Sequence, residues 1–326
     1  MKALVYEGVE TLGVREVDMP KPGTGEHLIR VEAVGICGSD MHAYLGHDER
    51  RPAPLILGHE AAGVIEAGPE KGRRVTINPL VTCCDCAYCR AGRENLCQSR
   101  QIISMPPREG AFAQFVAVPD RNLVTVPGNV PLAVAALAEP LAVSWHAARL
   151  GLEALHPAME RRALVIGGGA IGLAAALSLA AMGVDDITMI EPNGARCAYL
   201  TEVCGQTCTA SAEAAAPLVI DAVGYAATRA TASQVADPGG VIVHVGLGDN
   251  FDGLDIRRMT LQEITFIGTY TYSAQDFRDT AQAIFDGRLG ALDWAETRAL
   301  TAGATAFADL QAGKVAAPKI ILDPWA

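Results

Sequence analysis

Up to about residue 130, the chain consists of short runs of alternating or wholly apolar residues. These runs are rich in Val and Ile and are separated by Gly and Pro, a pattern that predicts short β-strands joined by turns. We expect strands at residues 2–8, 27–37, 61–68, 73–80, 112–120 and 122–128. The amino-terminal part is therefore predicted to be β-rich.

From about Pro131 the pattern changes to long alanine-rich segments with helical character, which alternate with apolar strands. A strand, a glycine turn and a helix are expected over residues 163–183. Further strands are expected at residues 186–192, 217–224, 239–248 and 317–324. Strands that alternate with helices predict a parallel sheet with right-handed crossover connections.

One apolar stretch, residues 163–184, carries no charge and is long enough to span a bilayer. Three consecutive glycines follow its short β-branched run, which favours a strand and a turn in a folded domain over a membrane helix.

The 326 residues are half hydrophobic and 19% charged, which suits about two domains with large cores. The net charge of -11 argues against nucleic acid or an anionic membrane as partner. Without a signal-peptide pattern at the amino terminus, we expect a cytoplasmic protein.

Four cysteines in the run CCDCAYCRAGRENLC have the spacing of a metal site. Cys83, Cys86, Cys89 and Cys97 are separated by gaps of two, two and seven residues. Four thiolates at such spacing form a closed tetrahedral zinc site, which is structural and leaves no position for a substrate. Secreted disulfide scaffolds are shorter and denser in cysteine, and the bacterial ferredoxin run has a gap of three before its last cysteine. Cys84 lies inside the run as a bystander or as a substitute ligand.

A glycine motif over residues 167–172 indicates a nucleotide site. Gly167, Gly169 and Gly172 follow an apolar strand, and Ala170 and Ile171 complete the motif at the start of a helix. Glycines at these positions allow a tight turn and let backbone N–H groups approach a pyrophosphate at the helix N-terminus. The alternative is a close contact between helix and strand without a ligand, but the motif has both the strand and the helix that a dinucleotide site requires.

An acidic residue follows the next strand at the position that dinucleotide folds use for the adenosine ribose. Glu191 lies 19 residues after Gly172. A carboxylate there accepts hydrogen bonds from both ribose hydroxyls and repels a 2′-phosphate, so NAD is favoured over NADP. Arg196 could pair with such a phosphate, but we expect it to lie over the adenine ring.

Three other segments carry side chains that suit a second metal site. The candidates are Cys37, Ser39, Asp40 and His42 in GICGSDMH, His59 and Glu60 in LGHEAAG, and Glu139 in LAEPLAV. Each is ordinary by itself, because a lone Cys is usually a small core residue and a lone His is usually a hydrogen-bonded structural one.

Taken together, the motifs resemble those of the zinc-dependent medium-chain dehydrogenases. They occur in the order found in that family and cover essentially the whole chain: GICGSDMH, GHEAAG, the four-cysteine run, AEPLAV and VIGGGAIG. EPL replaces the cysteine-bearing segment of liver alcohol dehydrogenases, so the branch resembled is that of polyol and L-threonine dehydrogenases. The resemblance implies an α/β fold with a GroES-like, β-rich catalytic domain over residues 1–133 and 273–326, with a structural zinc lobe at about 81–100. A Rossmann domain with a doubly wound parallel sheet is implied over residues 134–272. The implied cofactors are NAD and two zinc ions per chain, and the implied assembly is a homodimer or homotetramer.

The resemblance also implies roles for individual residues. Cys37 and His59 match the catalytic-zinc ligands, and Glu60 and Glu139 match two carboxylates of which one binds the zinc directly. Which of the two does so stays open from the sequence.

Ser39 matches the hydroxyl that contacts the substrate alcohol, and His42 matches the outer end of a proton relay. Asp40 is expected to hold a ligand in place. A catalytic zinc keeps one coordination position open and lowers the pKa of bound water from 15.7 to about 7, worth about 12 kcal/mol. The pKa of a bound alcohol should be lowered in the same way. A lone histidine base would not supply as much free energy.

Two further segments match backbone around the cofactor. These residues are Val245, Gly246 and Leu247, which face the nicotinamide in the family, and Thr269, Tyr270 and Thr271, which line the cleft. A plainer interpretation of both is a strand end and a loop.

The expected reaction is the oxidation of a secondary hydroxyl of a polyol or small alcohol by NAD. Ala43 and Thr271 stand where sorbitol dehydrogenases have a tyrosine and an arginine, so a polyol bound by that arginine is not expected. The alternatives are an L-threonine-type amino-alcohol dehydrogenase and, in a different class, a non-catalytic nucleotide-binding protein or a quinone reductase relative on the same scaffold. Two shortened connections, near Arg73 and around residues 211–216, should leave the core intact.

Overall fold

The computed structural model describes residues 1–326 and divides the chain into two compact units. Unit 1 comprises Met1–Glu139, Ser273–Gly287 and Ala295–Ala326, and unit 2 comprises Pro140–Tyr272 and Arg288–Trp294. These bounds differ from the predicted ones at two places. Residues 134–139 belong to unit 1, and residues 288–294 return to unit 2.

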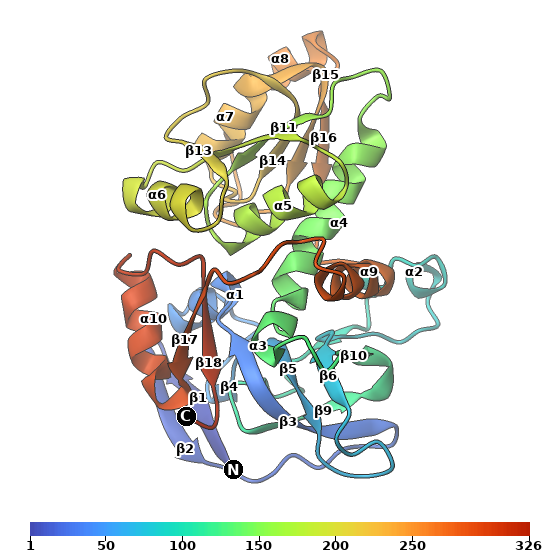
Figure 1. Cartoon of the computed structure of the whole chain (residues 1–326), viewed down its shortest axis with the longest axis vertical. Helices are drawn as coiled ribbons and strands as arrows, with labels where there is room; N and C mark the ends of the chain where they lie inside the picture. The colour runs from blue at the N-terminus through green and yellow to red at the C-terminus, as the bar shows by residue number, and fades with distance from the viewer. The chain divides into compact units, whose positions relative to one another are not determined.

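Unit 1 is β-rich, as predicted (Figure 1). Its strands are β1 (Lys2–Gly8), β2 (Thr11–Glu16), β3 (Glu26–Gly35), β4 (Leu55–Ile56), β5 (Glu60–Ile65), β6 (Arg74–Ile77), β7 (Leu80–Val81), β8 (Gln101–Ile102), β9 (Phe115–Pro119), β10 (Leu123–Thr125), β17 (Ala295–Ala299) and β18 (Lys319–Asp323). Its helices are α1 (Gly38–Tyr44), α2 (Ala87–Arg90), α3 (Leu132–Ala135), α9 (Ala274–Phe285) and α10 (Gly303–Gln311), with 3₁₀ turns at Glu94–Leu96, Asp120–Asn122 and Leu300–Ala302.

The largest sheet of unit 1 brings distant parts of the sequence together. Its strands are ordered β10-β6-β5-β3-β18-β17, and β9 also pairs with β3. The strand β18, from the end of the chain, pairs antiparallel with the last residues of β3, which in turn pairs with β5. The end of β3 and the starts of β5 and β18 therefore lie side by side, and the candidate metal residues lie next to them.

Unit 2 contains a parallel six-stranded sheet. Its elements are β11 (Arg162–Ile166), α5 (Ala170–Ala181), β12 (Asp186–Ile190), α6 (Gly194–Glu202), β13 (Thr207–Thr209), β14 (Ala216–Asp221), α7 (Ala226–Val235), β15 (Ala236–His244), α8 (Ile256–Leu261) and β16 (Thr265–Gly268), and most of α4 (Ala138–Ala154) precedes them. The strand order β13-β12-β11-β14-β15-β16 is the doubly wound order 3-2-1-4-5-6 of dinucleotide-binding folds. This confirms the predicted fold class.

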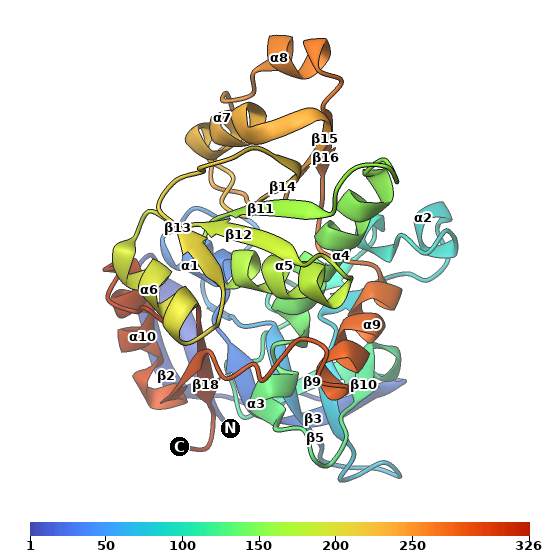
Figure 2. The ribbon, with the colours of Figure 1, turned by 45° about the horizontal axis from the view of Figure 1, so that its top comes forward.

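Helices flank both faces of this sheet. In Figures 1 and 2, α5 and α6 lie on one face and α7 lies on the opposite face. The connection from β13 to β14 is short and has no helix, in agreement with the shortened segment seen in the sequence. The core under α7 is formed by aliphatic residues that include Leu164, Val219 and Ile242.

The apolar stretch at residues 163–184 folds as β11 and the 12-residue helix α5. None of the helices has both the length and the apolar character needed to cross a bilayer.

Candidate functional site

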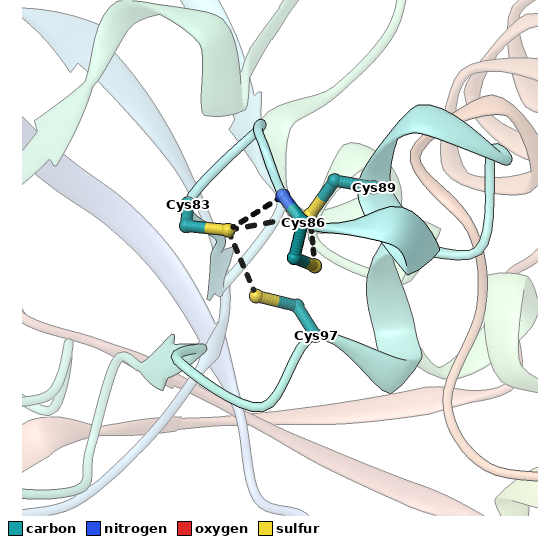
Figure 3. Close-up of side chains that lie close together, drawn as sticks. All are labelled: Cys83, Cys86, Cys89 and Cys97. Carbon is teal, nitrogen blue, oxygen red and sulfur yellow. Dashed lines mark hydrogen bonds between the residues drawn. The ribbon is translucent and has the colours of Figure 1, made fainter.

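The four spaced cysteines converge in the loop between β7 and β8 (Figure 3). Cys83 Sγ lies 3.5 Å from Cys97 Sγ and 3.8 Å from Cys89 Sγ, and Cys86 Sγ lies 3.5 Å from Cys89 Sγ. Four sulfurs around a zinc with bonds of about 2.3 Å would be about 3.8 Å apart, whereas a disulfide holds them at about 2.0 Å. All nine cysteines of the chain are free thiols. The spacing therefore fits four ligands around one zinc.

The electrostatics of the cluster also call for a cation. Backbone N–H groups of Asp85 and Cys86 lower the pKa of Cys83 to about 6. Burial, followed by the neighbouring sulfurs, raises the pKa of Cys89 to about 12. Because thiolates repel one another, the four sulfurs ionise together only with a cation between them, and zinc would supply it.

Cys84 is not part of the cluster. It adopts a left-handed conformation with φ of 61°, and its sulfur lies 3.7 Å from the carbonyl oxygen of Thr82. The loop is fastened to the rest of unit 1 by Glu94, whose carboxylate accepts a hydrogen bond from the backbone N–H of Ala274 at 3.2 Å.

A second group of metal-binding side chains forms where β3 ends and β5 and β18 begin. The donor atoms of Cys37, His59 and Glu60 all lie within 4.8 Å of one another. Cys37 follows β3 as the N-cap of α1, and the other two lie at the start of β5. A Cβ on Gly35 would lie 2.1 Å from Glu60 Oε2, so only glycine lets this carboxylate approach the end of β3.

Asp40 fixes the orientation of this group. It is fully buried, and its two oxygens accept the backbone N–H groups of Cys37 at 3.0 Å and Gly58 at 3.2 Å. Its Oδ1 also lies 3.4 Å from His59 Nδ1. A proton on Nδ1 leaves the lone pair of Nε2 for a metal, which is the usual arrangement of a metal-bound histidine.

The surroundings of His59 favour positive charge. Burial alone would lower the pKa of His59, but the charges of Asp40 and Cys37 outweigh it and hold the pKa well above 6.5. Burial likewise opposes ionisation of Asp40, yet His59 and Arg51 keep its pKa below 3.8. A site that stabilises a proton in this way also stabilises a metal cation.

Lys319 pairs with one oxygen of Glu60. The ammonium of Lys319 lies 2.7 Å from Glu60 Oε1 and donates to the carbonyl oxygen of Ile36 at 2.9 Å. Glu60 Oε2 is buried and has no hydrogen-bond partner. Because an unpaired buried carboxylate oxygen is costly, this atom is available to a metal ion.

The charges around the site leave room for a divalent cation. The ionisable acidic groups are Cys37, Asp40, Glu60 and Glu139, and the buried cationic ones are Arg51 and Lys319. Arg51 is also paired with Asp48, so the acidic side chains outnumber the cationic ones, and a divalent cation would offset this excess. The residues present therefore fit a zinc ion.

The other predicted residues of this site lie nearby in unit 1. Glu139 is buried in the first turn of α4, and its charge acts on Lys319, although it is outside the group of three donors. Ser39 and His42 lie in α1, three residues apart and hence on one face of the helix. Ser39 is half-buried and His42 is exposed.

The glycine motif of unit 2 has the geometry of a phosphate-binding turn. Gly167 has a φ of 104°, and a Cβ on Gly172 would lie 1.8 Å from the carbonyl oxygen of Gly167. Gly169 is the N-cap of α5, and a Cβ there would meet no atom within 4 Å. Ala170 and Ile171 form the first turn of α5. The helix N-terminus therefore faces open space that suits a pyrophosphate.

Glu191 lies beside this turn at the end of β12. It is 6% exposed, and it accepts the backbone N–H groups of Gly168 at 2.9 Å and Asn193 at 2.8 Å. Arg196 Nη1 lies 3.7 Å from Glu191 Oε2, so this arginine pairs with the carboxylate. The arrangement holds the carboxylate next to the glycine motif.

The two predicted cofactor segments follow adjacent parallel strands. Residues 245–247 come after β15, and residues 269–271 come after β16, at the same edge of the sheet as the glycine motif. The N–H groups of Val245 and Gly246 donate to the carbonyl oxygen of Asp221, and Leu247 is exposed. The N–H of Thr269 donates to the carbonyl oxygen of His244. Thr271 has a φ of 47°, and its buried hydroxyl has no partner.

A third cluster does not suit a metal. His27 lies 3.1 Å from Asp120 and 3.4 Å from Glu70, but Arg73 already pairs with both carboxylates. In this surface network Arg73 already compensates part of the carboxylate charge.

Comparisons with known proteins agree with this geometry. The sequence model of the alcohol dehydrogenase GroES-like domain matches residues 23–128, and that of the zinc-binding dehydrogenase domain matches residues 170–286. The L-galactonate-5-dehydrogenase of Escherichia coli K12 is 30% identical over 309 residues, which cover 89% of each chain. The sorbitol dehydrogenase of Arabidopsis thaliana is 30% identical over 292 residues, covering 81% of this chain and 79% of that one.

The chain belongs to the zinc-dependent medium-chain dehydrogenases. Among solved structures, a putative zinc-binding dehydrogenase from Sinorhizobium meliloti 1021 bound to NADP superposes with a TM-score of 0.87. It is 26% identical, and the match covers 99% of both chains.

The dehydrogenase contains polar networks that the sequence did not reveal. Asp221 is buried at the end of β14 and accepts the N–H groups of Val223 and Gly224 at 3.0 Å, and His244 Nδ1 lies 3.2 Å from it. The only signal for this residue was an acidic side chain at the end of an apolar strand.

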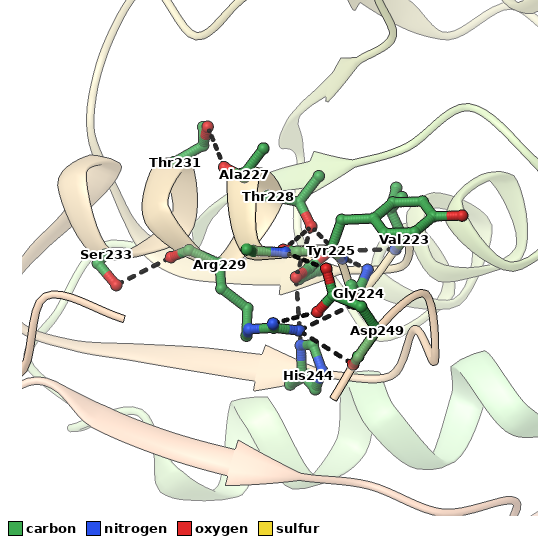
Figure 4. Close-up of polar contacts among 12 residues, drawn as sticks. Val223, Gly224, Tyr225, Ala227, Thr228, Arg229, Thr231, Ser233, His244 and Asp249 are labelled. Atoms are coloured by element: carbon green, nitrogen blue, oxygen red, sulfur yellow. Dashed lines mark hydrogen bonds and ion pairs between the residues drawn. The ribbon is translucent and has the colours of Figure 1, made fainter. Parts of the chain in front are cut away.

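Next to it, Arg229 fastens the loop that follows β15 (Figure 4). Arg229 is 6% exposed and donates to the carbonyl oxygens of Gly224 at 2.9 Å and Asp252 at 2.7 Å. It also pairs with the carboxylate of Asp249. In unit 1, the buried polar residues that the sequence did not reveal are Lys319, Arg51 and Ser104.

Proposed function

We propose that this dehydrogenase uses zinc and NAD to oxidise a secondary hydroxyl of a polyol or a related small alcohol to the ketone. The observation that carries the proposal is the convergence of Cys37, His59 and Glu60, with one carboxylate oxygen left unpaired. Relatives that are dehydrogenases of L-galactonate and sorbitol support the choice of a polyhydroxylated substrate.

Each residue near the metal site has a defined task in this reaction. A zinc ion held by Cys37 and His59 would act as a Lewis acid on the substrate hydroxyl, while NAD supplies the hydride acceptor. Ser39 would take the hydroxyl proton while it passes its own proton on, and His42, on the same face of α1, would release a proton to solvent. Asp40 holds His59 in the tautomer that presents Nε2.

We further propose that Glu60 is the carboxylate that binds zinc directly. Glu60 belongs to the group of three donors and its Oε2 is unpartnered, whereas Glu139 lies outside that group. Glu60→Gln should then reduce the zinc content from two ions per chain to one, and Glu139→Gln should keep both. The opposite result would assign the direct bond to Glu139.

The structural zinc is the second ion of the proposal. Its ligands are Cys83, Cys86, Cys89 and Cys97, whose sulfur spacing suits a tetrahedral site. The nine free thiols of the chain suit a reducing compartment, and we place the enzyme in the cytoplasm as part of this proposal.

NAD is proposed over NADP because of Glu191. Its carboxylate is held at the end of β12, where it would accept the ribose hydroxyls and repel a 2′-phosphate. The relative from Sinorhizobium meliloti was solved with NADP, so a direct comparison of the two cofactors is needed.

A homodimer or homotetramer is proposed from the edge of the sheet in unit 2. The strand β16 is the last of its sheet and has a free edge, on which Phe266 is 36% exposed. Leu247, Phe251 and Leu261 are exposed apolar side chains of the same unit. A second copy that pairs along this edge would satisfy the free backbone groups of β16 and cover Phe266.

The deciding experiment screens purified enzyme against polyols, aldonates, simple secondary alcohols and threonine, with NAD and with NADP. We expect substrate-dependent NADH formation with polyols or aldonates and two zinc ions per chain. Turnover confined to threonine would assign the amino-alcohol reaction instead, and no turnover on the panel by protein that holds both zinc ions would contradict the proposed function.

Cys37→Ala is the matched test of the catalytic assignment. It should abolish turnover and remove one zinc ion, while NADH binding stays close to that of the wild type. Cys84→Ala, an exposed cysteine outside both clusters, is the control and should keep activity and both ions. Full activity in Cys37→Ala would show that the reaction uses other residues.

A further inference from the structure

Arg51 is a buried charge near the candidate metal site that the reaction described above does not use. It is 2% exposed, and its guanidinium reaches two separate segments of unit 1. Nε donates to the carbonyl oxygen of Ser104 at 3.0 Å, and Nη1 donates to the carbonyl oxygen of Ser39 at 2.8 Å. Asp48 Oδ2 lies 3.3 Å from Nη1 and supplies the counter-charge. A buried arginine with this many partners fixes the segments that it contacts.

The first of these segments carries the proposed substrate contact. Ser39 lies in the first turn of α1, between Cys37 and His42. Because Arg51 holds the Ser39 carbonyl, it fixes the backbone from which the Ser39 hydroxyl projects. A shift of this turn would move the hydroxyl relative to the metal.

The second segment contacts the proposed metal ligand. Ser104 is fully buried, and its Oγ lies 3.3 Å from His59 Nδ1. Ser104 has a φ of 75°, in the left-handed region that non-glycine residues rarely adopt. Such a conformation persists only where the surroundings hold it, and the bond from Arg51 to the Ser104 carbonyl is one of the contacts that do so.

We propose that Arg51 is a positioning residue that couples the substrate-contacting serine to the metal-binding histidine through Ser39 and Ser104. The planar fork of the guanidinium suits this task, because its separate N–H groups reach two carbonyls in fixed directions. A lysine has a single ammonium and would satisfy fewer of these contacts. The inference rests on the proposed function, because it uses the roles assigned to Ser39 and His59.

The test compares Arg51→Met and Arg51→Lys with Arg50→Met. Arg50 is 63% exposed and its guanidinium pairs with the same Asp48, so it is the matched control at the surface. The measurements are kcat and KM, the rate at which a chelator removes the catalytic zinc, and the NADH dissociation constant.

For Arg51→Met we expect kcat to fall and zinc release to accelerate, each about 10- to 100-fold, as for other partners that orient metal ligands. NADH binding should stay within about twofold of the wild type, because the nucleotide motif lies in unit 2. Arg51→Lys should recover part of both losses, and Arg50→Met should resemble the wild type.

Ser104→Ala tests the contact with His59 separately from the contact with Ser39. It also provides the test if Arg51→Met does not fold. It removes only the hydroxyl next to His59, so zinc release should accelerate about tenfold while the KM for the alcohol stays unchanged. Wild-type rates of zinc release in both Arg51→Met and Ser104→Ala would overturn the inference. So would wild-type release in Ser104→Ala alone if Arg51→Met fails to fold. If the wild-type enzyme holds no zinc, or has no NAD-dependent activity, the proposed function is wrong instead. The two failures are therefore distinguishable.

Discussion

In zinc-free protein, substitution of Lys319 by methionine should destabilise unit 1 strongly, because it leaves Glu60 as a buried carboxylate without a neighbouring cation. Lys319 is 3% exposed, and the pair is joined at 2.7 Å. Removing one partner of a buried ion pair costs about 3–5 kcal/mol. For a domain of about 150–250 residues this corresponds to a loss in Tm of about 6–20 °C.

The pH dependence of this effect follows from the pKa of Lys319. Burial alone would lower that pKa, but the charges of Glu60 and Cys37 outweigh it and raise the pKa above 10.5. A raised pKa means that the stabilisation is fully present below pH 10.5 and is lost only as the pH rises through the folded value. Titration of Lys319 should therefore add no pH dependence to the stability of the wild type between about pH 6 and about pH 9.

The assay is calorimetric or denaturant unfolding of wild type, Lys319→Met and Lys314→Met. Lys314 is 71% exposed and lies 3.8 Å from Asp309, so its surface pair should contribute at most about 1 kcal/mol. In zinc-free protein, the double variant Lys319→Met/Glu60→Gln should recover most of the loss, because no buried charge remains unpaired. If Lys319→Met costs no more than Lys314→Met, the buried pair does not have the role argued here.

Three further predictions concern the other networks. Cys89→Ser should reduce the zinc content by one ion per chain and lower Tm, as measured by metal analysis and calorimetry, because the sulfur cluster loses a ligand. Arg229→Met should weaken NADH binding about tenfold in a fluorescence titration, because the loop after β15 loses the bonds that fasten it; an unchanged dissociation constant would contradict this. Burial opposes ionisation of Asp221, but His244 and backbone N–H groups outweigh it and hold the pKa below 3.8. Its stabilisation is therefore present above pH 3.8 and lost as the pH falls through the lower folded value, so Asp221→Asn should flatten the acid limb of the stability profile.

The parts of the fold with a strong local pattern were predictable from the sequence. The glycine motif after β11 and the acidic residue after β12 have fixed spacing, because a single strand, turn and helix contain them. The four cysteines were predictable for the same reason, since one short loop carries them all.

The residues that could not be predicted act across long sequence distances. Lys319 reaches Glu60 only because β18 pairs with the end of β3, a contact between opposite ends of the chain. Arg51 stands in a run of charged residues that looks like an exposed loop, and nothing local indicates that Ser104 will pack against it. Burial of a charge depends on tertiary pairing, which periodicity and spacing do not encode.

The proposed reaction depends on one metal ion bound where Cys37 and His59 meet, beside a carboxylate and apart from the cysteine cluster. Anomalous diffraction at the zinc absorption edge on crystals of the purified enzyme tests it most directly. We expect two peaks per chain, one among the four cysteine sulfurs and one bonded to Cys37 Sγ, His59 Nε2 and a glutamate oxygen. A single peak in the cysteine cluster, in an enzyme that still reduces NAD, would contradict it.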